Sequence, residues 1–231
     1  LPKGFVSGSV AAGLKSSGAL DLTIIQNLGP LNIGTAVFTT NKVVAAPVTW
    51  SRQVIKGGQV SAVVLNSGGA NACTGPQGFA DTHKTAELVA AKLDLSSSEV
   101  VVCSTGLIGE LLPMDKIEAG IGAISLDNQG FDLSSKAIMT TDTVPKKVTI
   151  TRDGVTTSGI AKGAGMLAPA LATMLSVIMT DAIVDSEVAK STFARAVDLT
   201  VNRIDSDGCT STNDTVPVSY THLTLPTILL V

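Results

Sequence analysis

The chain has 231 residues, of which 45% are hydrophobic and 15% are charged, and its formal net charge is −3. This length and composition fit one large domain or two small ones with a sizeable core, and they exclude a disordered chain. Aromatic residues make up only 3%, so the core must consist mainly of Val, Ile, Leu and Ala. No basic run and no apolar run of membrane-spanning length is present, so we expect neither nucleic acid nor a membrane as a partner.

Three cysteines are widely spaced, at Cys73, Cys103 and Cys209, and none belongs to a CxxC pair. Their spacing does not match a metal site, so no metal is expected. A reduced cytosolic or organelle-matrix compartment fits this usage better than secretion. We expect Cys73 to be a small buried residue rather than a nucleophile.

The first half of the sequence predicts strands at residues 21–26, 35–40, 61–65 and 100–103, and helices at 47–56 and 79–93. Pro47 supports the first helix, because proline suits the first helical position. The second helix is predicted from apolar or small residues that recur on one helical face.

The second half predicts a helix at residues 114–126 and a hairpin formed by strands 147–152 and 155–160. Asp153-Gly154 lies between these two strands and is a strong hairpin signal. A buried strand is expected at 174–179. A final helix is expected at 186–202, capped by Asp185 or Ser186.

Three segments at or near strand ends carry polar side chains. Residues 66–75 form a loop rich in Gly and Asn that lacks the known phosphate-binding patterns, so a tight turn is the plain interpretation. Residues 104–106 read Ser-Thr-Gly, and a hydroxyl with a glycine amide at a strand end can stabilise a developing oxyanion, although the same residues are common in ordinary turns. Residues 140–146 are rich in threonine, and their hydroxyls could equally cap the end of a strand.

Thr173 stands between an apolar stretch and the predicted strand at 174–179, after a glycine-containing turn that begins at Lys162. A threonine needs a base before it can act as a nucleophile at neutral pH. If the Ala172–Thr173 bond is cut, the new amine of Thr173, with an ordinary pKa of about 7.7–8.0, can be that base. Threonine paired with its own amine is an established nucleophile. The same residues also fit an ordinary glycine-rich turn that enters a buried strand, in which Thr173 would only favour the strand.

Residues 162–166, 168–169 and 172–175 resemble the self-processing site of the ornithine acetyltransferase family, the bifunctional glutamate N-acetyltransferases of arginine biosynthesis. The family usually has Asn-Met after the proline, where this chain has Ala170-Leu171. Further segments match the family, namely residues 2–5, 11–15, 66–75, 137–146 and 207–214. The resemblance covers nearly all of residues 1–217.

This resemblance implies a layered αββα-type α/β sandwich, the DmpA/ornithine acetyltransferase-like fold. It implies self-cleavage at Ala172–Thr173. An acetyl group would then pass from N-acetylornithine, or from acetyl-CoA as a substrate, to glutamate through an acetyl-threonine intermediate. No cofactor is implied. The site residues carried over are Thr173 as nucleophile, Thr105 and Gly106 as oxyanion hole, and Thr140, Lys162 and Thr173 as substrate contacts.

The resemblance also divides the chain into an α-chain region at 1–172, the start of a β-chain region at 173–217, and a tail at 218–231. The two cleaved chains would form an α/β heterodimer that assembles into a heterotetramer. The expected location is the cytoplasm, or the mitochondrial matrix or a plastid in a eukaryote.

The resemblance stops near Val218, and we expect the tail to be foreign to the protein. The family continues beyond this point with a glutamate and a C-terminal Asn and Thr, so we expect a truncated form. Other interpretations stay open from the sequence. One is an N-terminal-nucleophile aminopeptidase or amidohydrolase with water as acceptor. Another is a non-catalytic small-molecule-binding domain or an inactive truncated fragment.

Overall fold

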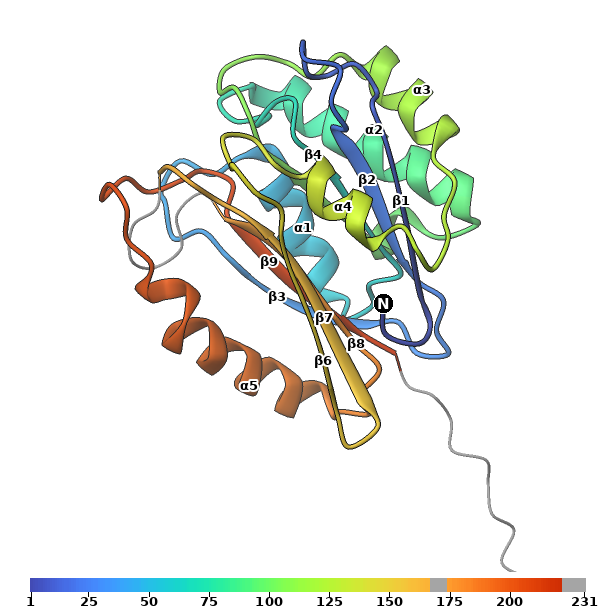
Figure 1. Cartoon of the computed structure of the whole chain (residues 1–231). Coiled ribbons are helices and arrows are strands. Elements are labelled where there is room, and N and C mark those ends of the chain that lie inside the picture. Colours follow the sequence, from blue (N-terminus) through green and yellow to red (C-terminus); the bar gives the residue numbers. More distant parts are fainter. Residues whose placement is uncertain (167–173, 222–231) are drawn as a thin grey trace, which may run out of the picture.

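The computed structural model describes residues 1–166 and 174–221, which form two β-sheets stacked face to face (Figure 1). The first sheet has the order β1-β2-β4-β5, with β1 at Phe5–Val10, β2 at Leu22–Asn27, β4 at Ala62–Asn66 and β5 at Val100–Ser104. β4 and β5 are parallel, and the other pairs in this sheet are antiparallel.

The second sheet has the order β3-β9-β8-β7-β6. Its strands are β3 at Ile33–Phe38, β6 at Lys146–Arg152, β7 at Val155–Lys162, β8 at Leu175–Thr180 and β9 at Thr215–Tyr220. β8 and β9 are parallel, and Lys162 at the end of β7 pairs with Leu175 at the start of β8.

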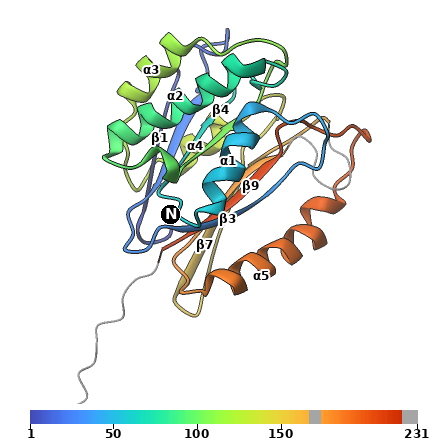
Figure 2. The same cartoon turned by 180° about the vertical axis from the view of Figure 1, so that it is seen from behind.

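Helices lie on both outer faces of the stacked sheets (Figures 1 and 2). α2 (Gly75–Leu93) and α3 (Met114–Ala123) pack against the first sheet, and α5 (Ser186–Leu199) lies on the second. α4 (Phe131–Ala137) contacts β1 and β2 as well as β6 and β7, so it fills one side between the sheets. The αββα sandwich expected from the sequence is therefore confirmed.

α1 (Ala46–Lys56) closes the open edge of the first sheet. The hydroxyl of Ser51 donates to the carbonyl of Val102 at 2.7 Å and accepts from its N–H at 3.0 Å. The indole of Trp50 donates to the carbonyl of Val100 at 3.0 Å. An edge strand exposes unpaired backbone groups, and these bonds satisfy the groups of β5 that no neighbouring strand reaches.

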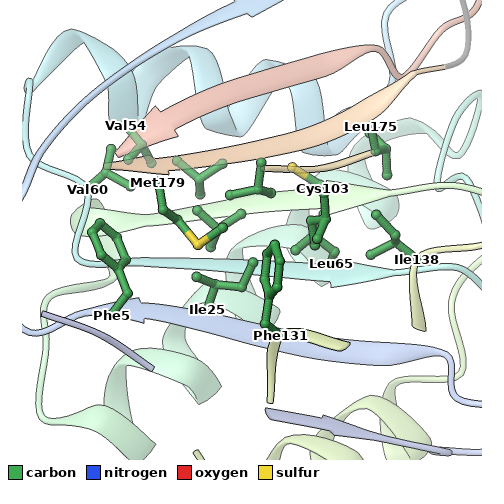
Figure 3. Close-up of a cluster of buried hydrophobic side chains, with 14 residues drawn as sticks. Phe5, Ile25, Val54, Val60, Leu65, Cys103, Phe131, Ile138, Leu175 and Met179 are labelled. Carbon is green, nitrogen blue, oxygen red and sulfur yellow. The ribbon is translucent and has the colours of Figure 1, made fainter. Parts of the chain in front are cut away.

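The main hydrophobic core lies between the two sheets (Figure 3). Ile25, Leu65 and Cys103 from the first sheet meet Leu175 and Met179 from the second. Val, Ile and Leu make up most of this layer, as the low aromatic content predicted, and Phe5 and Phe131 join them. Burial raises the pKa of the Cys103 thiol well above its usual range, so this cysteine is an inert core residue.

The strands and helices predicted from the sequence are present, with ends that differ by a few residues. α2 begins at Gly75 rather than at 79, because a proline is accommodated in its first turn. Asp153 and Gly154 both have positive φ, of 51° and 80°, as the hairpin required. Asp185 caps α5 by accepting from the N–H groups of Glu187 and Val188. Three elements, β1, α4 and β9, were not predicted.

The predicted boundary at residue 217 lies inside β9, which continues to Tyr220. Val218 and Tyr220 are buried, and the hydroxyl of Thr221 donates to the carbonyl of Gly29 at 2.6 Å. The first residues of the expected tail therefore belong to the second sheet. No helix in the described part of the chain is long and apolar enough to cross a membrane.

The layer between the sheets should carry much of the stability. Leu65→Ala removes a side chain that is 1% exposed and should lower the free energy of unfolding by about 2–5 kcal/mol. Leu133→Ala is the matched control, because Leu133 lies on α4 and is 45% exposed. Urea denaturation of both variants measures the difference. Equal losses would contradict the assignment of the core.

Candidate active site

A cavity of about 720 Å³ opens where the parallel strands β4 and β5 end. Ligands commonly bind outside the carboxyl ends of parallel strands, because loops from neighbouring strands meet there. The end of β7 and the loop near Asp207 form the other side of the cavity. It is lined by Leu14, Lys15, Ser16, Ser17, Ser67, Gly68, Thr105, Gly106, Leu107, Thr140, Thr141, Lys162, Gly165, Met166 and Asp207.

Thr105 and Gly106 follow β5 directly and are fixed by the loop that follows β4. The N–H of Thr105 donates to the carbonyl of Asn66 at 3.0 Å, and an isolated β-bridge joins Thr105 to Gly69. Gly106 has a φ of +137°, and a Cβ atom there would lie 2.7 Å from the backbone nitrogen of Gly69. Only glycine fits, because both the dihedral angle and the close approach of backbone exclude a side chain.

Lys162 is the largest fully buried side chain of the described structure, with an exposed fraction of 2%. Its Nζ atom donates to Oγ1 of Thr105 at 3.1 Å. An ammonium group has no lone pair, so Thr105 must accept this bond, and its own O–H remains available to donate into the cavity. Burial lowers the pKa of Lys162, and the nearby carboxylates of Asp142 and Asp214 oppose that shift without cancelling it.

Asp142 connects the threonine-rich segment to the turn after β7. Its carboxylate accepts from the N–H of Gly163 at 2.9 Å, from the N–H of Thr140 at 3.2 Å, and from the ammonium of Lys146. Burial raises the pKa of Asp142, but these hydrogen bonds and the charge of Lys146 outweigh it, so the net pKa is below its ordinary value. A charged Asp142 therefore fixes two walls of the cavity and faces Lys162.

Asp214 fixes the start of β8, on the same side of the molecule. It is fully buried, and its Oδ1 atom accepts from the N–H of Met174 at 2.6 Å. Burial raises the pKa of Asp214 to about 7, against the opposing effects of hydrogen bonds from Met174 and Ser211 and the charge of Lys162. The preceding residue, Asn213, donates to the carbonyl groups of Ala70 and Ser104, which ties this segment to the first sheet.

The segment 12–15 forms a further wall. The buried carboxylate of Asp21 accepts from the N–H groups of Ala12 at 2.7 Å, Leu14 at 2.6 Å and Lys15 at 3.0 Å. The ammonium of Lys15 donates to the carbonyl of Leu20 at 2.8 Å, and burial lowers its pKa. A second cationic side chain thus faces the cavity from the wall opposite the second sheet.

The structure brings Thr105, Gly106, Thr140 and Lys162 to one cavity, and their individual roles stay predictions. The proposed cleavage site, Ala172 and Thr173, lies outside the described residues. Both described neighbours of that segment are anchored: Met166 donates its N–H to Asp207 at 2.7 Å, and Met174 donates to Asp214.

Two interpretations from the sequence are wrong. Residues before Thr140 belong to the helix α4, so the threonine-rich segment does not end a strand. Cys73 is exposed rather than buried, and it lies in the loop after β4 with a φ of +59°.

Sequence reasoning missed Lys15, Asp142 and Asp214 as parts of this site. Each of them stands inside a segment that matches the ornithine acetyltransferase family, at residues 11–15, 137–146 and 207–214. The family match identified these segments but not which polar residue in each belongs to the site. That choice depends on hydrogen bonds that form only in the folded chain.

Comparison with known proteins shows the family of the chain. The sequence profile of the ArgJ family matches residues 6–224, and the chain belongs to that family. The arginine biosynthesis bifunctional protein ArgJ of Streptomyces coelicolor is 56% identical over 216 residues, which cover 93% of this chain and 56% of that protein. The ArgJ protein of Mycobacterium leprae is 54% identical over 225 residues, covering 93% and 55%. The chain therefore spans little more than half the length of these curated relatives.

Two solved structures share the fold. The ornithine acetyltransferase of Mycobacterium tuberculosis, solved in complex with ornithine, has 53% sequence identity and a TM-score of 0.70, over 75% of this chain and 94% of that chain. The arginine biosynthesis bifunctional protein of Bacillus halodurans has 36% identity and a TM-score of 0.68, over 75% and 92%.

Gly106 offers a test of the geometry at the end of β5. Gly106→Ala should destabilise the fold by at least about 3 kcal/mol, because backbone rather than a flexible side chain meets the new methyl group. Gly154→Ala is the control, since Gly154 also has positive φ but nothing lies within 4 Å of its Cβ position, and the cost there should be about 1–2 kcal/mol. Thermal and urea unfolding measure both. Equal losses would mean that the close contact with Gly69 is absent.

Proposed function

We propose that the protein to which this chain belongs is an acetyltransferase of arginine biosynthesis. It takes an acetyl group from N-acetylornithine, or from acetyl-CoA, and transfers it to glutamate through an acetyl ester on Thr173. The contact between Lys162 and Thr105 is the observation that carries the proposal. It orients a hydroxyl donor beside a glycine, at the edge of a cavity where both sheets contribute polar groups.

Acetyl transfer creates a negative oxygen on the carbonyl under attack, and the described site suits that charge. The O–H of Thr105 is free to donate because Lys162 occupies its acceptor side. The charge of Lys162 beside this hydroxyl strengthens it as a donor. Donors that are held in place before charge develops commonly contribute a factor of about 10²–10³ in rate. The backbone N–H of Gly106 would be the second donor.

The lengths of the relatives support self-cleavage. The curated Mycobacterium tuberculosis ArgJ is longer than this chain, since 93% of this chain covers only 56% of it. The solved ornithine acetyltransferase chain of the same species is shorter than this chain, since 75% of this chain covers 94% of it. A cut within the protein would leave a chain of this shorter kind. The family match at Ala172–Thr173 supplies the position for the cut.

After the cut, the free amine of Thr173 acts as the base for acetyl transfer. It takes the proton from the Thr173 hydroxyl while Oγ1 bonds to the acetyl carbonyl carbon. The negative oxygen would lie between Thr105 and Gly106. The intermediate collapses as ornithine leaves with that proton, and the amine of glutamate then attacks the ester in the reverse sequence. The covalent ester divides one difficult transfer into two easier steps.

The cut would leave two chains that stay associated, because residues from both regions share one fold. β8 and β9 follow Thr173, yet they pair with β7 and β3, which precede it. We propose the α/β heterodimer as the basic unit, a heterotetramer as the assembly, and the cytoplasm as the location.

Thr173 is the residue to test first, in the full-length protein. Thr173→Ala removes the oxygen and should leave a single uncut chain without acetyltransferase activity. Thr173→Ser keeps the oxygen but loses the methyl group that restricts its rotamer, so it should be cut and turn over more slowly. Intact-mass spectrometry after incubation with N-acetylornithine and no glutamate should show two chains, with one acetyl group on the chain that begins at Thr173. A single uncut chain with full activity would refute the mechanism.

Thr105 tests the oxyanion hole. Thr105→Ala should lower kcat for acetyl transfer by roughly a hundredfold, because one donor to the transition state is lost. Thr105→Ser retains the hydroxyl and should recover most of that loss. Steady-state kinetics with glutamate as acceptor give the comparison, and the same assay without glutamate measures transfer to water. An enzyme that prefers water would be a hydrolase rather than an acetyltransferase.

A further inference from the structure

Asp142 is a buried carboxylate that is held next to Lys162. Its side chain is 1% exposed, and its Oδ1 atom accepts from the N–H of Gly163 at 2.9 Å and from the ammonium of Lys146. Its Oδ2 atom accepts from the N–H of Thr140 at 3.2 Å. Gly163 directly follows Lys162 in the chain, so the carboxylate is bonded to the backbone beside the buried lysine. The negative charge of Asp142 acts on the ammonium of Lys162 and favours its charged form.

The direction of the Thr105 hydroxyl depends on whether Lys162 is charged. An ammonium can only donate, so the charged lysine occupies the acceptor side of Oγ1 and leaves the O–H of Thr105 to donate into the cavity. A neutral amine has a lone pair and can accept a hydrogen bond. The O–H of Thr105 can then turn towards the lysine, and the cavity loses that donor.

We propose that Asp142 is a positioning residue for acetyl transfer: its carboxylate holds Lys162 in the charged form, and the charged lysine directs the O–H of Thr105 into the cavity. The inference rests on the proposed function, because it assumes that this hydroxyl donates to an oxyanion. In this role Asp142 acts through Lys162 and needs no contact with the substrate.

The burial of Lys162 makes a neighbouring anion necessary. Its exposed fraction is 2%, and an ammonium removed from water tends to lose its proton unless other groups compensate. Burial lowers the pKa of Lys162, and Asp142 from the segment before β6 is the largest opposing influence. Asp214 from the segment before β9 also raises this pKa, whereas the like charges of Lys146 on β6 and Lys15 in the segment 12–15 lower it.

Asp142 is the more constant of the two anions. Its hydrogen bonds and the charge of Lys146 hold its pKa below the ordinary value, so it stays charged throughout the neutral and alkaline range. Burial raises the pKa of Asp214 to about 7, so that carboxyl group is partly protonated near neutral pH. The charge that Lys162 meets at every working pH is therefore that of Asp142.

Lys146 separates an electrostatic role of Asp142 from a purely structural one. Its ammonium binds Asp142, its side chain is 45% exposed, and its charge lowers the pKa of Lys162. Asp142→Asn removes an anion from the surroundings of Lys162, whereas Lys146→Gln removes a cation. Both substitutions break the same ion pair, but they should change the pKa of Lys162 in opposite directions.

The test measures kcat for acetyl transfer from N-acetylornithine to glutamate by the full-length protein, from about pH 7 to about pH 10.5. Lys162 is charged below its pKa, so kcat should fall in the alkaline range as the proton is lost. Asp142→Asn should move the midpoint of this fall to lower pH by about one unit or more, and Lys146→Gln should move it to higher pH. The substrates titrate alike in every variant, so differences between variants come from the protein.

Asp132→Asn is the matched control. Asp132 pairs with Lys147, the residue next to Lys146, but its side chain is 62% exposed and lies at the surface. The substitution makes the same chemical change to the carboxylate of an adjacent ion pair. It should leave kcat and the alkaline midpoint close to those of the wild type.

Thr105→Ala tests the second step of the inference. This variant lacks the hydroxyl that the charged lysine directs, so the kcat that remains should no longer fall as Lys162 loses its proton. A fall with the wild-type midpoint would mean that the charge of Lys162 acts on the reaction by another route. That result would overturn the orientation of Thr105 through Asp142 and Lys162.

The outcomes separate this inference from the proposed function. A full-length wild type that transfers no acetyl group to glutamate refutes the proposed function and this inference with it. An active wild type whose midpoint is unchanged in Asp142→Asn, or moves in the same direction in both variants, refutes the role of Asp142 alone. If Asp142→Asn does not fold, Lys146→Gln decides, and an unchanged or lower midpoint in that variant overturns the inference.

Discussion

The buried ammonium of Lys162 is the constraint on which the site depends. A charged group with an exposed fraction of 2% needs compensating partners, and here they come from three separate parts of the chain. Thr105 accepts its hydrogen bond, and the carboxylates of Asp142 and Asp214 supply negative charge. The same contacts orient a hydroxyl donor, a threonine-rich wall and the start of β8 around one cavity. The contacts that stabilise the buried lysine are therefore the same contacts that arrange the site.

The two-sheet architecture makes these contacts possible. β4 and β5 bring the segments 66–69 and 104–107 to one edge of the first sheet, and β7 and β8 bring Lys162 and Met174 to the facing edge of the second. The apolar layer between the sheets fixes their separation (Figure 3). The side chain of Asn213 then bridges the sheets through the carbonyl groups of Ala70 and Ser104. The polar groups of the site therefore lie at strand ends and on loops that the two sheets hold in place.

The two chemical stages proposed for Thr173 would make different demands on this site. The proposed self-cleavage would act on a continuous backbone, whereas the proposed acetyl transfer would use the amine that cleavage creates. Asp214 and Lys162 lie close enough to affect each other's pKa, and both are buried. In the proposed acetyl transfer, the charge of Lys162 would act on the oxyanion through its hydrogen bond to Thr105.

The sequence by itself determined most of the regular elements, because periodicity, turn residues and caps are local properties. The Asp153-Gly154 hairpin and the Asp185 cap are examples, and family motifs marked the segments of the site. The sequence did not predict β1, whose small residues lack an alternating pattern, α4, which is short, or β9, whose last residues were assigned to a foreign tail. Only the tertiary structure decided that Asp214 holds Met174 and that Lys162 bonds to Thr105. Those residues are 40 and 57 positions apart in the chain, and only sheet packing fixes such distances.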